Sequence, residues 1–255
     1  MTNQDILNIA MRQSATDLSC SPDDFLRDKN ITVISYKSNG ARRYLELPFS
    51  CNLVSYGNNI VASVSKECES AVSDYINKFP REHCFETPNM NVLADKLAPL
   101  GQKLCFMAEY FLPDLSALKP LDCGYEIKLL VPDDFTDLYK PEWSNALCEK
   151  RRELDVIGIG AYDNRKLIAL AAASADCDTM LQIGIDVLPE YRRKGIASAL
   201  TSRLALKILE FGKVPFYCAA WSNIGSVRNA VKSGFRPAWV ELTAKPDSFV
   251  DNMNR

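Results

Sequence analysis

The sequence predicts an α/β fold in which a mixed, mostly antiparallel sheet is flanked by helices. In the C-terminal half, apolar segments at 157–162, 167–175 and 180–187 are separated by short polar turns, which is typical of an antiparallel meander. A segment with helical periodicity at 196–211 and another apolar segment at 214–220 follow. Because a strand, a helix and a strand in succession usually place the two strands in parallel, we expect a mixed sheet.

The longer of the expected helices in this half has a continuous apolar face and a defined end. Ile196, Leu200, Leu204 and Ile208 recur every four residues and therefore share one face. Gly212 follows the helix, and glycine is the residue that most often ends one.

A shorter helix is expected further along the chain. Ser222 or Asn223 would cap its first turn, because a side-chain oxygen at this position accepts a hydrogen bond from a backbone N–H. Val227 and Ala230 form its apolar face, and Gly234 ends it.

The N-terminal half alternates between segments of helical and extended character. Helices are expected at 5–17, 67–79 and 91–100, and strands at 31–36, 44–47, 52–56, 60–64 and 103–111.

A strand at 125–130 begins the second sheet, and the linker before it falls within 115–123. We therefore predict an N-terminal α/β domain at 1–120, a second domain at 123–246 and a flexible polar tail at 247–255.

The composition is that of a globular protein. The chain has 255 residues, of which 47% are hydrophobic and 24% charged, and a net charge of −2. Without an overall basic excess, the chain is not expected to bind nucleic acid. No apolar run reaches the roughly 18 residues that a membrane span needs, so we expect no membrane association.

Cysteine usage indicates a reducing compartment. The nine cysteines are widely spaced and form no Cys-x-x-Cys pair, which favours free thiols in the cytoplasm. A metal site is not expected, because the only histidine, His83, has a single cysteine, Cys84, nearby.

The segment at 192–198 has the chemistry of an anion site. Arg192, Arg193, Lys194 and Gly195 form a short basic turn between a predicted strand and a predicted helix. The first turn of a helix has unpaired N–H groups, and the helix dipole adds partial positive charge there. The turn is therefore suited to a phosphate group, and Gly195 lets the backbone approach it closely.

Two common nucleotide motifs do not fit this turn. A P-loop places its lysine after the second glycine, whereas Lys194 precedes the only glycine here. A dinucleotide fingerprint needs three glycines at fixed spacing.

The pattern Arg192-x-x-Gly195-x-Ala197 instead resembles the acyl-CoA pyrophosphate loop of the GNAT acetyltransferase superfamily. The run at 185–191 before it is similar to the strand-to-loop signature of that superfamily.

A second block, Asn223-x-x-Ser226-x-x-x-Ala230-x-x-x-Gly234-Phe235, is similar to the one that follows in the same family. The resemblance covers about residues 125–243, which is half of the chain.

The resemblance implies acetyl-CoA as co-substrate and an amine as acceptor. It implies that the strands at 180–187 and 214–220 splay apart and that the pantetheine arm of acyl-CoA lies in the gap. The implied acyl-CoA-binding residues are Ile185, Val187, Leu188, Arg192, Arg193, Lys194, Gly195, Ile196, Ala197, Ser198, Asn223 and Ser226. For Asn223, the roles of helix cap and of cofactor contact both stay open.

No catalytic residue is assigned. Many relatives have a general-acid tyrosine in the second block, where this chain has Ala230. The glutamate usual on the central strand is also missing, and Asp186, the nearest carboxylate, is interpreted as a structural hydrogen-bonding residue rather than a base. Four further residues are candidates for an acceptor cleft: Glu142, Trp143, Glu149 and Tyr162.

The function expected from these patterns is acyl-CoA-dependent N-acyl transfer, with acetyl passing to a primary amine by direct attack in a ternary complex. The alternative is a catalytically silent acyl-CoA-binding regulatory protein, because the usual tyrosine and glutamate are absent. A degenerate copy of the GNAT fold in the N-terminal half is a further hypothesis, by analogy only. The sequence leaves both a monomer and a homodimer open.

Replacing Gly195 by Glu is expected to abolish acyl-CoA binding and leave the fold intact, because a side chain and a negative charge would enter the phosphate position. Calorimetric titration with acetyl-CoA measures the affinity, and circular dichroism checks the fold. Unchanged affinity would contradict the assignment of this loop.

Overall fold

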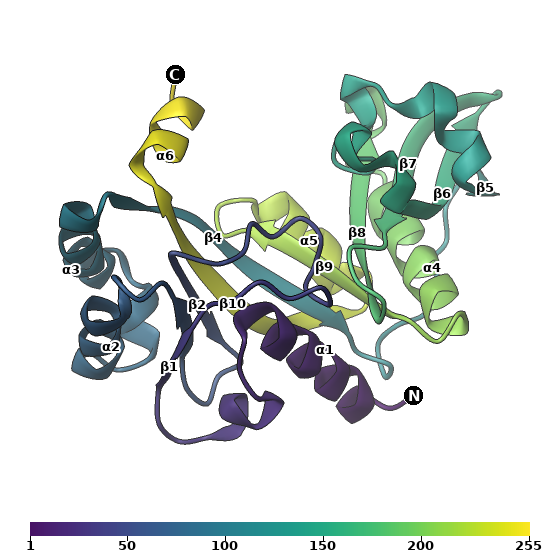
Figure 1. The fold of residues 1–255 in the computed structure, drawn as a ribbon. Helices are drawn as coiled ribbons and strands as arrows, with labels where there is room; N and C mark the ends of the chain where they lie inside the picture. Colours follow the sequence, from purple (N-terminus) through teal and green to yellow (C-terminus); the bar gives the residue numbers. More distant parts are fainter. The chain divides into compact units, whose positions relative to one another are not determined.

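The computed structural model describes residues 1–255, which form two compact units (Figure 1). Unit 1 comprises Met1–Ile9 and Tyr110–Pro237, and unit 2 comprises Ala10–Glu109 and Ala238–Arg255. Three elements contribute residues to both units: α1 (Asn3–Leu18), β4 (Gln102–Pro113) and β10 (Phe235–Pro246).

The strands of unit 1 follow the order β4-β9-β8-β7-β6-β5. Their bounds are β5 Glu126–Leu130, β6 Asp155–Asp163, β7 Lys166–Ser174, β8 Met180–Val187 and β9 Val214–Ala220. Strands β5 to β8 pair antiparallel in chain order, whereas β8 and β9 pair parallel. The predicted meander and the predicted parallel pair are both confirmed.

Both faces of this sheet are covered, which explains why β7 is apolar along its length. Ala169, Ala171 and Ala173 belong to a core shared with α4 (Ile196–Glu210). Leu170 belongs to a second core on the opposite face, as the alternation of side chains along a strand requires. The helix α5 (Ile224–Lys232) contacts α4 and β9.

Short 3-10 helices connect β5 to β6 and supply the second core. They span Pro132–Leu138, Pro141–Trp143 and Glu149–Leu154. Phe135 and Trp143 from these turns are buried against Leu170 and Ala172.

Unit 2 has its own core, and the ten strands of the chain belong to one sheet. The strand order is β1-β3-β2-β10-β4, with β1 (Ile31–Ile34), β2 (Cys51–Ser55) and β3 (Val61–Val64). Helices α2 (Glu69–Lys78) and α3 (Thr87–Leu97) contact each other, and α2 contacts β1 and β3 (Figure 1).

The strand predicted at 44–47 is wrong. Leu45 N–H donates to Arg42 C=O, so the segment turns instead of extending. The Arg42 side chain is buried and forms an ion pair with Asp17, with Nε and Oδ2 2.8 Å apart, and Glu241 lies on its other side. This contact between distant parts of the chain outweighs the local β-propensity of the segment.

The C-terminal end also differs from expectation. The sequence analysis assigned no strand to the 12 residues of β10. The residues expected to form a polar tail begin with a short helix, α6 (Asp247–Met253).

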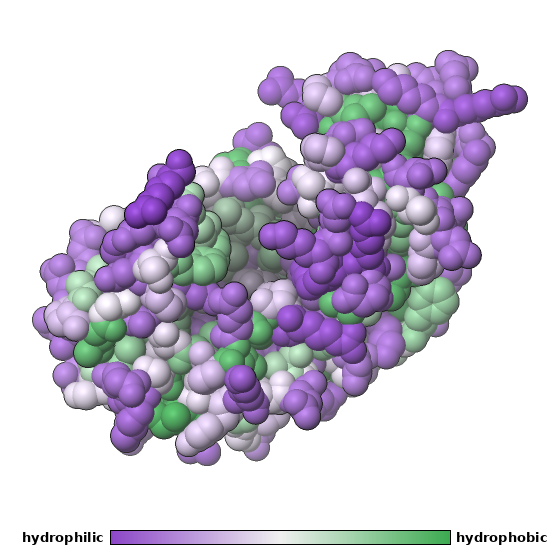
Figure 2. Space-filling view, turned by 45° about the horizontal axis from the view of Figure 1, so that its top comes forward, coloured by the Kyte–Doolittle hydropathy of each residue, from purple (hydrophilic) through white to green (hydrophobic).

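Hydrophilic residues cover most of the face drawn in Figure 2, and its apolar residues form small, scattered patches. No helix is both long enough and apolar enough to span a bilayer.

Replacing Gly184 by Ala is expected to destabilise the protein. A Cβ atom on Gly184 of β8 would lie 1.9 Å from the carbonyl oxygen of Asn145, and backbone must move to remove this clash. We expect the free energy of unfolding to fall by about 1–3 kcal/mol. Urea denaturation measures the change.

Gly124→Ala is the matched control, because a Cβ atom there meets no atom within 4 Å. Its effect should stay within about 0.5 kcal/mol. Equal transition midpoints for the two variants would contradict the close approach at Gly184.

Candidate functional site

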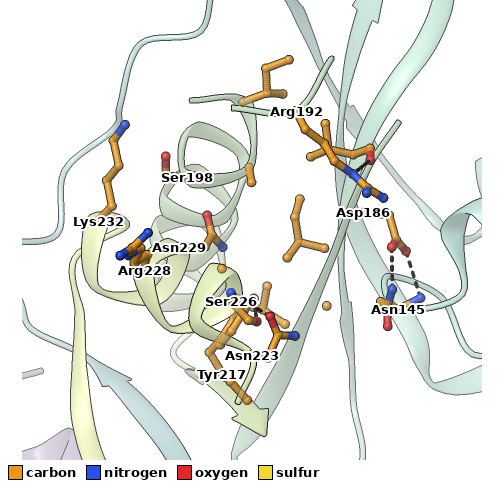
Figure 3. A pocket seen from close by; sticks show the side chains of 18 of the residues that line it. Asn145, Asp186, Arg192, Ser198, Tyr217, Asn223, Ser226, Arg228, Asn229 and Lys232 are labelled. Carbon is orange, nitrogen blue, oxygen red and sulfur yellow. Dashed lines mark hydrogen bonds between the residues drawn. The ribbon is translucent and has the colours of Figure 1, made fainter. Parts of the chain in front are cut away.

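The parallel ladder of β8 and β9 is short, and the two strands separate beyond it. The pairing runs from Met180 with Val214 to Gln182 with Phe216, although β8 continues to Val187 and β9 to Ala220. The space between them is a cleft of about 840 Å³, which we call the β8–β9 cleft. It is lined by these strands, by the loop after β8, by the start of α4 and by α5 (Figure 3).

Backbone groups of β8 face this cleft. Leu188 N–H donates a hydrogen bond to Ile168 C=O. In this antiparallel register the backbone groups of residue 188, and of every second residue before it, therefore hydrogen-bond to β7. The N–H and C=O groups of Ile183, Ile185 and Val187 therefore point to the opposite edge of the strand. Beyond the last β8–β9 pair this edge lines the cleft, and apart from Val187 C=O, which accepts from Arg192 Nε at 3.0 Å, it is available to an extended ligand with amide groups.

The loop after β8 directs N–H groups at one end of the cleft. Arg193 and Gly195 have left-handed backbone conformations, with φ of +63° and +81°. The first backbone hydrogen bond within α4 runs from Ala199 N–H to Gly195 C=O. The N–H groups of residues 196–198 precede it and have no partner within the helix, which makes this turn an anion site.

Four cationic side chains line the same cleft. Arg192 and Arg193 come from the loop, and Arg228 and Lys232 come from α5, on the other side in Figure 3. The Lys232 amine lies 3.8 Å from the position that a Cβ atom on Gly195 would occupy. None of the four forms an ion pair within the chain. The geometry suits a ligand that carries several phosphate charges.

Asp186 is the one carboxylate in the cleft lining, and its oxygens are occupied. Oδ2 accepts from the N–H groups of Asn145 and Ala146, both at 2.9 Å, and Oδ1 accepts from Asn145 Nδ2 at 2.7 Å. This carboxylate holds the 145–146 backbone over Gly184. These three hydrogen bonds are what a structural hydrogen-bonding residue would make.

The N-terminal turn of α5 contributes polar groups to the cleft. Asn223 Oδ1 accepts from Ser226 N–H at 3.1 Å, so Asn223 is the helix cap. Ser226 Oγ and Tyr217 Oη are 2.6 Å apart. Asn229, one turn of α5 further on, donates from Nδ2 to Thr201 Oγ1 of α4 at 3.1 Å.

The structure brings ten of the twelve predicted acyl-CoA-binding residues into the cleft lining, all except Leu188 and Lys194. The N–H of Leu188 is used by β7, so it cannot serve a ligand. Lys194 turns away, with Nζ 3.4 Å from Tyr125 Oη and 4.9 Å from the centre of the Tyr191 ring.

None of the four residues suggested for an acceptor cleft lines this one. Trp143 is buried in the second core of unit 1, and Glu149 pairs with Arg152. Tyr162 has Lys128 over its ring, and Glu142 is exposed in a 3-10 turn.

Sequence reasoning missed Arg228, Lys232 and Tyr217. The first two are four residues apart on a helix and so share one face, which is a detectable signal once the phosphate loop is recognised. Tyr217 gave no signal, because it lies in a segment whose apolar pattern alone indicates a buried strand.

Comparison with known families agrees with this geometry. Residues 58–238 match the family described as GNAT acetyltransferase. The chain therefore belongs to the GNAT acetyltransferase family, which uses acetyl-CoA. The match begins well before the motifs that carried the sequence resemblance. A search of curated proteins finds no match.

Several solved structures are similar at low identity. A GCN5-related N-acetyltransferase-like protein from Streptococcus suis is 19% identical, with a TM-score of 0.46 over 62% of this chain and 69% of that one. A GCN5-related N-acetyltransferase from Kribbella flavida is 15% identical, with a TM-score of 0.45 over 75% of this chain and 82% of that one. A Salmonella typhimurium protein solved with acetyl-CoA is 15% identical, with a TM-score of 0.37 over 49% of this chain and 95% of that one.

Proposed function

We propose that the protein is an acyl-CoA-dependent N-acyltransferase that transfers acetyl from acetyl-CoA to a primary amine, by direct attack in a ternary complex. One observation carries this proposal: the β8–β9 cleft joins an exposed strand edge to a cationic helix start. Acyl-CoA combines the matching features, an arm with amide groups and a terminal cluster of phosphates.

The residues present fit this co-substrate. The N–H groups of residues 196–198, with Arg192 and Lys232, would hold the pyrophosphate. The N–H and C=O of Ile185 and the N–H of Val187 would bond the pantetheine arm, whereas Val187 C=O already accepts a hydrogen bond from Arg192 Nε at 3.0 Å. The cleft volume of about 840 Å³ lies within the roughly 300–1,000 Å³ typical of ligand sites.

Bound acetyl-CoA would supply the activated acyl group, and the chain would supply position and electrostatics. Backbone N–H groups on the β8 edge are preorganised donors for an oxygen that gains negative charge. The only carboxylate in the lining is occupied by three hydrogen bonds, so no side chain of the cleft is assigned as base. Rate enhancement would then come largely from holding the amine and the acyl carbon together.

One observation favours the alternative, a catalytically silent acyl-CoA-binding regulatory protein. Asp186 is committed to the 145–146 backbone, and Ala230 has no titratable group. Such a protein would bind the thioester and leave it intact.

We place the protein in the cytoplasm, because its nine cysteines are all free thiols. We keep both a monomer and a homodimer open.

The first test is calorimetric titration with acetyl-CoA, CoA and desulfo-CoA, followed by CoA release with a panel of primary amines. Micromolar binding and amine-dependent release are expected. Binding without release by any amine would support the regulatory alternative. No binding to any of the three ligands would overturn both functions.

Replacing Lys232 by Met should weaken acetyl-CoA binding about tenfold, because one charge-assisted contact to phosphate is lost. The salt dependence of the affinity should fall as well. The matched control is Lys150→Met, since Lys150 is exposed and does not line the cleft. Equal affinities for the two variants would contradict the assignment of α5 as the second phosphate wall.

A further inference from the structure

Tyr217 lies where the cleft begins. It follows Phe216, the last residue of β9 that pairs with β8. Its ring is 6.4 Å from the rings of both Phe111 and Phe235, and only 3% of the residue is exposed. The hydroxyl lies beside the first turn of α5, next to Ser226 and Asn223 (Figure 3).

Three neutral side-chain acids line the cleft, and their partners distinguish them. Tyr191 donates its hydroxyl proton to Asp163 at 3.0 Å, and this carboxylate holds the proton in place. Cys218 Sγ accepts a hydrogen bond from Gln182 Nε2 at 3.2 Å. Tyr217 has a hydroxyl partner, Ser226 Oγ at 2.6 Å, which can both accept and donate, and Asn229 also hydrogen-bonds to the phenol.

The hydroxyls of Tyr217 and Ser226 can together carry a proton between the cleft and the surrounding solvent. Tyr217 belongs to the core cluster of unit 1, whereas Ser226 is partly exposed on α5. A proton given up by the phenol can be replaced through Ser226 from solvent.

We propose that Tyr217 is a catalytic residue, whose Oη–H gives its proton to the sulfur of CoA as the thioester breaks, with Ser226 relaying the replacement proton. The assignment rests on the proposed function, because it needs CoA in the β8–β9 cleft. The amine nitrogen bonds to the acyl carbon, and the carbon–sulfur bond breaks with its electron pair staying on sulfur. The amine loses one proton to water, the sulfur gains one from Tyr217, and Tyr217 recovers one through Ser226.

The environment keeps the phenol protonated at neutral pH. Burial raises the pKa of Tyr217, against the lowering effect of the hydrogen bonds with Ser226 and Asn229. The negative charge of Asp186 on β8 acts in the same direction as burial. From α5, Arg228 and Lys232 are the charged residues that line the same cleft.

The test is the pKa of the CoA thiol in the binary complex, followed by the ultraviolet absorbance of the thiolate as pH is raised. It needs no acceptor and no turnover. A phenol that donates to the sulfur stabilises the thiolate and lowers the thiol pKa. Tyr217→Phe should therefore raise the pKa of bound CoA by about one to two pH units.

Tyr162→Phe is the matched control, because Tyr162 does not line the cleft and should leave the thiol pKa unchanged. A second substitution protects the test against misfolding of the phenylalanine variant. With 3-fluorotyrosine, a stronger acid, in place of Tyr217, the pKa of bound CoA should shift downward instead.

The outcomes separate the two proposals. If wild-type protein binds no CoA, the proposed function fails, and the role of Tyr217 fails with it. If CoA binds normally at low pH and neither substitution moves the thiol pKa, the role of Tyr217 is overturned while acyl-CoA binding stands. Opposite shifts from the two substitutions support it.

Discussion

The separation of β8 and β9 is the constraint on which the rest of the site depends. After Gln182 and Phe216 the two strands no longer satisfy each other's backbone groups, and unpaired groups in a protein interior are costly. On one side, Asp186 anchors the 145–146 backbone over Gly184, where a methyl group does not fit. The gap is therefore a built feature of the fold, and its exposed edge calls for a ligand that has amide groups of its own.

Charge divides this cleft into two ends. Where α4 begins, helix N–H groups and cations from both walls face the same space, so that end favours phosphate. Near the last strand pair the lining holds no cation, Gln182 donates a hydrogen bond to Cys218 Sγ, and the Asp186 carboxylate accepts hydrogen bonds from three N–H donors. A ligand with one highly charged end and one neutral reactive end matches this division, and it can enter in one orientation only.

The parts of this arrangement that sequence predicts are those that arise locally. The β8 strand, the glycine turn and the α4 helix are contiguous, and each has its own pattern, so their order and most of the phosphate loop could be predicted. Leu188 was placed wrongly because its role depends on which β7 carbonyl it meets, and a motif does not encode that. Likewise β10 and the turn at Arg42 are set by pairing and charge contacts between residues far apart in the chain. Lys232 reaches the loop only because α5 folds back on it.

The core of unit 1 has little room for a phenol at position 230, and it already holds one at position 217. Ala230 is fully buried and belongs to the same core cluster as Tyr217. A tyrosine at 230 would have to enter this packed core, and overpacking of a core is destabilising. Ser226, one turn before Ala230, then meets the hydroxyl that arrives from β9. The loss of an acid from the helix therefore does not imply a silent site, because the strand opposite can deliver the same chemical group to the same cleft.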